Sequence, residues 1–194
     1  MDTTDTEAQD RADMARLVGG HDAALNDLMG RHATTVFHFL YRMLGNEDDA
    51  NDLAQDTFVR VYRARQSYKP DQKFSTWFFT IAGNLARNHH RWRSRHPAVS
   101  LDAANADTDQ SLGDTLPSAT ANPHQATDAT ERAEAVRAAV QTLPDDLREA
   151  IVLCEWEDMA VSEAAAILKI TPKAVESRLY RARAFLRARL RQWL

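Results

Sequence analysis

The chain has 194 residues, a formal net charge of −4, 44% hydrophobic residues and 27% charged residues, which is typical of a globular protein with one domain or two small ones. No apolar run approaches the roughly 18–20 residues that a membrane span requires, and the acidic N-terminus lacks the basic-then-apolar order of a signal peptide. The single cysteine, Cys154, cannot form an internal disulfide. Together these features predict a cytoplasmic protein.

Charge is segregated along the chain. Residues 1–56 hold twelve acids and four basic residues, whereas residues 57–97 hold nine basic residues and one acid. Residues 98–131 contain six acids and neither lysine nor arginine, and residues 169–194 contain eight basic residues against one acid. Two separate basic blocks in an acidic chain indicate two contact surfaces for a polyanion, although two solvated helix faces would give the same pattern.

An acidic segment over residues 1–20 comes first and is followed by two predicted helices. Apolar residues recur at three- and four-residue steps from residue 22 to 44, and Gly45 then provides a C-terminal cap. Asn46 is the N-cap of the next helix, which has acids in its first turn and ends before Pro70.

A third helix is predicted between Ser75, as its cap, and Pro97. Its apolar stripe includes Trp77 and Phe78, which we expect in the core. Its C-terminal half is the stretch RNHHRWRSRH, residues 87–96, with four arginines, three histidines and no acid.

Residues 98–130 are rich in Ala, Asp, Thr, Ser and Asn and contain no aromatic residue, which predicts a flexible acidic linker. Helices then follow over 131–143, 144–159, 161–169 and from Pro172 onwards, the last with Thr171 as its cap. No stretch alternates with a period of two. We therefore expect an all-α fold of two small helical domains, residues 21–97 and 131–194, joined by the linker.

The last two helices are separated by a turn of about three residues and form a helix-turn-helix pattern. One face of the last helix is apolar, with Val175, Leu179, Ala182 and Leu186 at steps of four, three and four. The opposite face is predicted to contact DNA and carries Lys173, Glu176, Ser177, Arg178 and Arg181. A plain basic surface helix would show the same spacing.

Two motifs resemble a known family. The stretches DDANDLAQDTFVRVYRA and FSTWFFTIAGNLARNHHRWRSR resemble region 2 of the extracytoplasmic-function (ECF) sigma factors, and residues 143–190 resemble their region 4. The resemblance implies a non-enzymatic subunit of bacterial RNA polymerase that selects promoters. Region 2 would bind the clamp helices of core RNA polymerase and open the −10 element, and region 4 would bind the −35 element and the flap.

The resemblance also assigns residues. The polymerase-binding motif of the family matches part of the second helix, and Asp49 shares its acidic face; the set is Asp49, Asp52, Leu53, Gln55, Asp56 and Phe58. A polar stripe at three- and four-residue steps on the third helix would contact the −10 DNA and consists of Asn84, Arg87, Asn88, Arg91, Trp92 and Arg95. Trp92 could stack on an unpaired base, which is worth roughly 1–3 kcal/mol, or pack on a neighbouring helix.

The family resemblance further implies promoter DNA as a partner and control by an anti-sigma factor, often anchored in the membrane. We expect no cofactor, no metal, no catalytic residue and no small-molecule substrate. A metal site on His89, His90 and His96 is disfavoured, because helical ligand pairs favour four-residue spacing. Two alternatives remain: a helix-turn-helix regulator that acts without polymerase, and a sigma-mimicking protein that titrates an anti-sigma factor.

Overall fold

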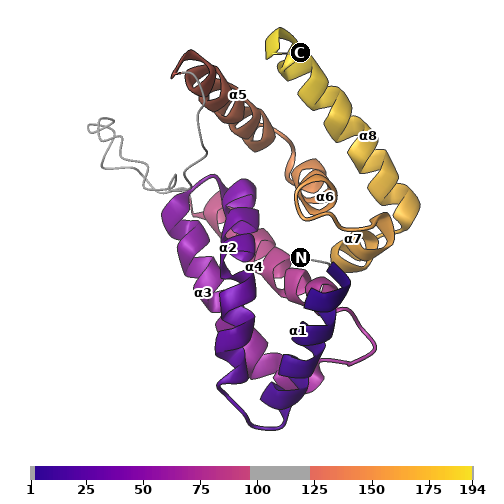
Figure 1. The fold of residues 1–194 in the computed structure, drawn as a ribbon. Helices are drawn as coiled ribbons and strands as arrows, with labels where there is room; N and C mark the ends of the chain where they lie inside the picture. The colour runs from indigo at the N-terminus through magenta and orange to yellow at the C-terminus, as the bar shows by residue number, and fades with distance from the viewer. Residues whose placement is uncertain (1–2, 97–122, 194) are drawn as a thin grey trace.

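The computed structural model describes residues 3–96 and 123–193, and every element in those two ranges is a helix (Figure 1). Residues 97–122, which hold most of the predicted linker, lie outside them. The first range contains α1 (Thr3–Val18), α2 (Ala24–Leu44), α3 (Glu47–Ala64), the 3-10 turn η1 (Arg65–Ser67) and α4 (Phe74–Arg95). The second contains α5 (Pro123–Gln141), α6 (Asp145–Glu155), α7 (Val161–Leu168), α8 (Pro172–Arg189) and η2 (Arg191–Trp193). The expected all-α fold is confirmed.

Helices α1–α4 enclose an aromatic core. Phe39, Phe74 and Phe78 are completely buried. The ring of Phe78 lies 5.4 Å from that of Phe58 and 5.3 Å from that of Phe74, within the range in which aromatic pairs stabilise one another. Phe78 is therefore a core residue, as predicted, whereas Trp77 is only partly buried at the edge of the cluster.

Local capping signals correctly predicted the boundary between α2 and α3. Gly45 has the left-handed φ of 70° that a helix C-cap requires, and the side chain of Asn46 accepts a hydrogen bond from the Asp49 N–H at 2.9 Å.

The start of α4 differs from the prediction. Ser75 lies inside the helix, which begins at Phe74, and Lys73 at the N-cap position makes no side-chain cap. The Phe74 N–H instead donates to the carboxylate of Glu7 at 2.5 Å. A tertiary contact thus supplies the cap, which is why the local sequence did not reveal it.

The acidic composition of residues 3–18 concealed a packed helix. Met14 and Leu17 of α1 are completely buried. Asp10 and Asp13 are nearly buried as well and pair with the Arg31 guanidinium of α2 at 2.9 and 2.6 Å. Because both carboxylates are paired, their burial costs little, and α1 is an integral part of the first helical bundle.

In the second half, α5 begins at Pro123 rather than at residue 131. Pro144 is the N-cap of α6 and not its first helical residue. The turn between α7 and α8 is as predicted: the Thr171 hydroxyl accepts from the Ala174 N–H at 3.2 Å, and Val175, Leu179 and Ala182 are buried.

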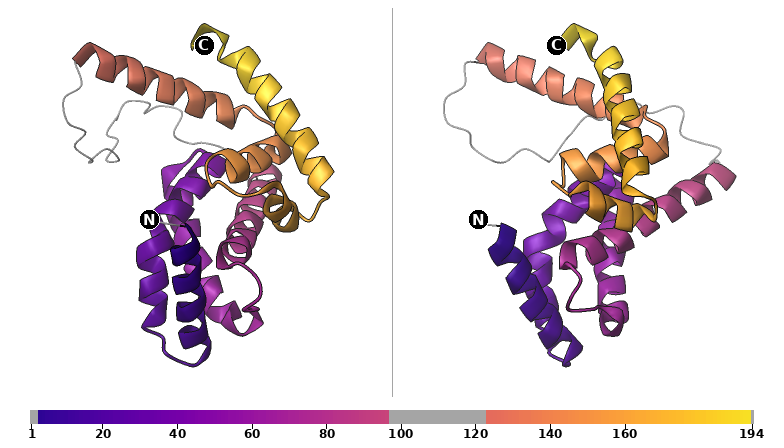
Figure 2. Two further views of the ribbon diagram at one scale, coloured as in Figure 1. Left: turned by 45° about the vertical axis from the view of Figure 1, so that its right-hand side comes forward. Right: turned by 90° about the vertical axis from the view of Figure 1, so that its right-hand side faces the viewer.

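The two halves are in direct contact. Helices α5–α8 lie at one end of the α1–α4 bundle (Figure 2), where α7 packs against α4, and α5 and α6 pack against α2. Their buried apolar side chains form one continuous cluster. Among the described residues, no helix is both long and apolar enough to cross a membrane.

Candidate nucleic-acid and polymerase interfaces

Five of the six predicted −10 residues form an exposed polar stripe along α4: Asn84, Asn88, Arg91, Trp92 and Arg95. The Asn88 side-chain oxygen accepts from the Arg91 guanidinium at 2.8 Å, which orients that arginine on the helix surface. The Trp92 indole is 59% exposed and stacks on the His96 ring at 5.1 Å. An exposed indole beside arginines can stack on an unpaired base.

Arg87, the sixth residue, is placed differently. Its guanidinium donates to Asn84 at 2.6 Å and also pairs with the Glu149 carboxylate of α6. Glu149 is 4% exposed. Burial raises the pKa of this carboxyl to about 7, and Arg87 and Arg178 oppose that rise. Arg87, one of the predicted −10 residues, therefore takes part in the contact between the halves.

The predicted polymerase-binding face lies on α3. Asp52 and Gln55 are exposed and Leu53 is partly buried. Asp49 accepts from Arg93 of α4 at 3.0 Å, and Asp56 pairs with Arg60 at 3.0 Å. Phe58 is 4% exposed, so it packs in the core and would support the face without touching a partner.

The three histidines of residues 87–96 point to separate places. His89 lies 3.4 Å from Asp49, the His90 ring bonds to the Met43 carbonyl at 3.0 Å, and His96 stacks on Trp92. Within residues 3–96 and 123–193, no three His, Cys, Asp or Glu side chains come together in a way that could hold a metal ion.

The predicted −35 face is presented by α8. Lys173, Glu176, Ser177 and Arg181 are exposed in its first three turns. Arg178 is partly buried, with its Nε 3.5 Å from the Asp146 carboxylate of α6. This cationic face opposite a buried stripe is the arrangement of a recognition helix.

Sequence reasoning missed the residues that join the halves. Arg148, 5% exposed, donates to the Met43 carbonyl at the end of α2 at 2.8 Å and to three carbonyls near the end of α5. Gln141 donates to the Arg42 carbonyl at 2.8 Å, and Lys73 pairs with Glu163 at 2.6 Å. Each of the contacts with the first half joins residues 90 or more positions apart, so no local pattern reveals them.

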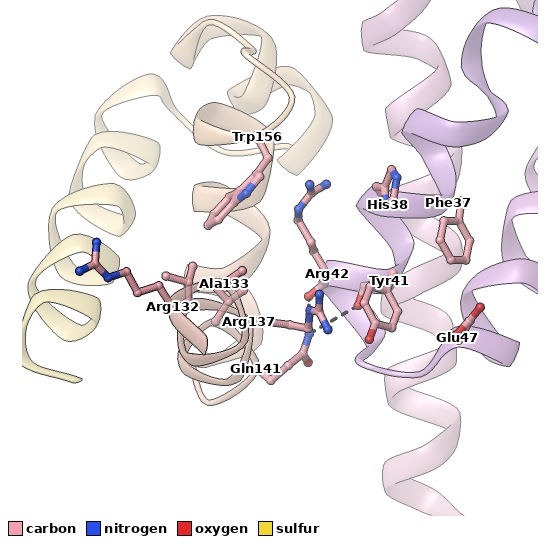
Figure 3. A pocket seen from close by; sticks show the side chains of 12 residues that line it. Phe37, His38, Tyr41, Arg42, Glu47, Arg132, Ala133, Arg137, Gln141 and Trp156 are labelled. Carbon is pink, nitrogen blue, oxygen red and sulfur yellow. Dashed lines mark hydrogen bonds between the residues drawn. The ribbon is translucent and has the colours of Figure 1, made fainter. Parts of the chain in front are cut away.

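A cleft of about 490 Å³ separates α2 from α5 beside these contacts (Figure 3). Phe37, Tyr41, Val136 and Trp156 provide apolar walls, and arginines 42, 132 and 137 line it from both sides. Arg42 lies over the Trp156 ring at 5.6 Å and pairs with Glu157 at 3.4 Å.

Comparison with known proteins agrees with this arrangement. Residues 28–96 match the family model "Sigma-70 region 2", and residues 133–186 match "Sigma-70, region 4". The ECF RNA polymerase sigma factor SigE of Mycolicibacterium smegmatis is 34% identical over 87% of this chain and 63% of its own length. The RNA polymerase sigma-H factor of Pseudomonas aeruginosa is 31% identical over 92% of each chain.

The fold is similar to that of CnrH, solved in complex with the cytosolic domain of CnrY. The TM-score is 0.69 at 28% identity, and the match covers 95% of this chain and 98% of CnrH. An all-α chain with two cationic helices and both sigma-70 regions is a transcription initiation factor and not an enzyme. The chain belongs to the ECF RNA polymerase sigma factors.

Proposed function

We propose that this chain binds core RNA polymerase in the cytoplasm, directs it to promoters with defined −10 and −35 elements, and is controlled by an anti-sigma factor. Residues 21–97 would bind the clamp helices and open the −10 element, and residues 131–194 would bind the −35 element and the flap. One observation carries the proposal: the same chain exposes two cationic helices, α4 and α8, and an acidic face on α3.

Polymerase binding rests on the acids of α3. Asp52 is exposed and Asp56 partly so, and their four-residue spacing places them on one helix face, where they can pair with basic residues of a partner. We expect Asp52→Arg with Asp56→Arg to weaken core binding at least tenfold. Glu134→Arg is the control, because Glu134 is an exposed acid of the second half.

The decisive experiment is run-off transcription. Purified chain and core polymerase are incubated with fragmented genomic DNA, and transcripts are sequenced. We expect transcripts with defined start sites that are lost with the Asp52→Arg, Asp56→Arg chain. If the unaltered chain yields no promoter-dependent transcript from any fragment, the proposal is wrong. Sequence-specific binding by the chain alone, without polymerase, would favour the helix-turn-helix regulator instead.

Control by a partner is proposed from the cleft between α2 and α5. Its apolar walls and arginine lining complement an amphipathic helix with acidic side chains, as the cytosolic part of an anti-sigma factor would present. Val136→Asp would place a carboxylate in the cleft and repel such a helix. In the host, we expect this variant to raise transcription from the chain's promoters; unchanged or lower transcription would argue against the cleft as the inhibitor's site.

A further inference from the structure

Side chains of the second half pack closely against two glycines of the first half. A β-carbon on Gly83 of α4 would lie 2.9 Å from the Glu149 carboxylate, and one on Gly45 would lie 2.8 Å from the Gln141 side chain. Both distances are shorter than real β-carbon contacts allow. Two glycines of the first half therefore leave room for two polar side chains of the second half, each of which bonds to the first half.

Glu149 binds Arg87, a residue that promoter opening would use. Its carboxylate faces the Arg87 guanidinium, and the pair is shielded from water on the Glu149 side, where the side chain is 5% exposed. A charged group held in a poorly hydrated pair is not free to bind a DNA phosphate or base. While the pair holds, the −10 stripe is left without one of its arginines.

The contact between the halves also keeps α4 and α8 closer together than the −10 and −35 elements of a promoter. By their names, the −10 and −35 elements lie about 25 base pairs apart, or roughly 85 Å at 3.4 Å per pair. The 22 residues of α4 and 18 residues of α8 span about 33 and 27 Å. Helix α7 packs on α4 and immediately precedes α8, so both surfaces cannot reach their elements at once.

The chain has the covalent length to open. The sequence places 28 steps between Arg95 and Pro123, and a fully extended segment of that length reaches about 90–100 Å. Separation of α6 and α7 from α4 would therefore permit the spacing that the two elements require.

We propose that Glu149, seated against Gly83, is an autoinhibitory residue that closes the chain on itself by taking up Arg87. Its release frees Arg87 and lets the two halves separate onto the promoter. This inference rests on the proposed function for its biological meaning, but the closure itself is a property of the chain alone.

The test measures closure directly. Spin labels are placed at Gly30→Cys on α2 and Tyr180→Cys on α8, both exposed positions, in a Cys154→Ala background. We expect a single narrow distance distribution for the free chain. In Glu149→Lys, most of the population should shift to a broad distribution of longer distances, because the new lysine then faces the Arg87 guanidinium. The exchange Arg87→Glu with Glu149→Lys should restore the narrow distribution, which excludes simple misfolding.

Glu155→Lys is the matched control. It makes the same charge change on the same helix, but its partner Arg183, at 2.5 Å, belongs to the same half, so the distribution should stay narrow. Binding to a fluorescein-labelled random single-stranded 20-mer should strengthen at least threefold more with Glu149→Lys than with Glu155→Lys.

Two results would overturn the inference: a broad distribution for the unaltered chain, or a narrow one that persists in Glu149→Lys. Neither depends on polymerase. A chain that closes as described but gives no promoter-dependent transcript would refute the proposed function alone.

Discussion

The carboxylate of Glu7, near the start of α1, accepts a hydrogen bond from the backbone N–H of Phe74 at 2.5 Å. The N-terminus of α4 would otherwise lack a side-chain cap, and a carboxylate at this place also interacts favourably with the helix dipole. Helix α1 thus stabilises the helix that carries the predicted −10 residues.

Removal of this cap should destabilise the first bundle. We expect Glu7→Ala to lower the free energy of unfolding by about 1 kcal/mol, the usual worth of an N-cap. Urea denaturation followed by circular dichroism measures the change. Asp5→Ala is the control, because Asp5 is an exposed acid of the same helix; an equal loss in both variants would mean that the cap contributes nothing specific.

Gly45 and Gln141 should be energetically coupled across the two halves. Gly45→Ala forces a β-carbon into a left-handed residue with φ of 70°, which costs about 1–2 kcal/mol, and against the Gln141 side chain. Removing Gln141 as well should relieve the contact but not the backbone strain. In a double-mutant cycle with Gln141→Ala, we expect a coupling of at least 0.5 kcal/mol; strict additivity would show that the contact is not maintained in solution.

Closure should strengthen as pH falls. Burial raises the pKa of Glu149 and of Glu157 to about 7, against the opposing effects of nearby arginines. In an open chain both carboxyls would meet water and return toward their ordinary range near pH 4.3. Closure therefore takes up protons between these values, and the closed form gains stability as pH drops through 7.

The spin-label distances at pH 7.5 and 5.5 test this sign. The charged groups that face Glu149 are Arg87, Arg178 and Asp145, and those that face Glu157 are Arg42 and Asp158. His90 lies 4.0 Å from Asp145. Glu149→Gln with Glu157→Gln should therefore reduce the pH dependence. More open chain at pH 5.5 than at 7.5 would contradict the prediction.

Two arginines of α8, Arg178 and Arg181, should have different roles: we expect Arg178 to contact a base and Arg181 to contact a phosphate. On a promoter recovered by run-off transcription, Arg178→Ala should cost about 1–3 kcal/mol and relax the preference at one −35 position. Arg181→Ala should weaken binding of all promoters alike and reduce the slope of log K against log salt by about 1. Footprinting of the holoenzyme at several salt concentrations measures both; identical behaviour of the two variants would remove the distinction.

Much of the architecture could be predicted because it depends on neighbours in sequence. Helical spacing placed Phe78, Val175 and Leu179 in the core, and the capping residues Asn46 and Thr171 act where predicted. The exposed faces of α3, α4 and α8 follow from the same periodicity, because a residue three or four positions away is a neighbour on any helix.

What the sequence by itself determined is therefore the set of helices, their buried stripes and the charge of each exposed face. Only the tertiary structure decided that Glu7 caps α4, that α1 belongs to the bundle, and that Arg87 faces Glu149 instead of solvent. The Glu7–Phe74 and Arg87–Glu149 contacts join residues 67 and 62 positions apart. Such pairs are selected by the packing of whole helices, and no periodicity within one helix specifies them.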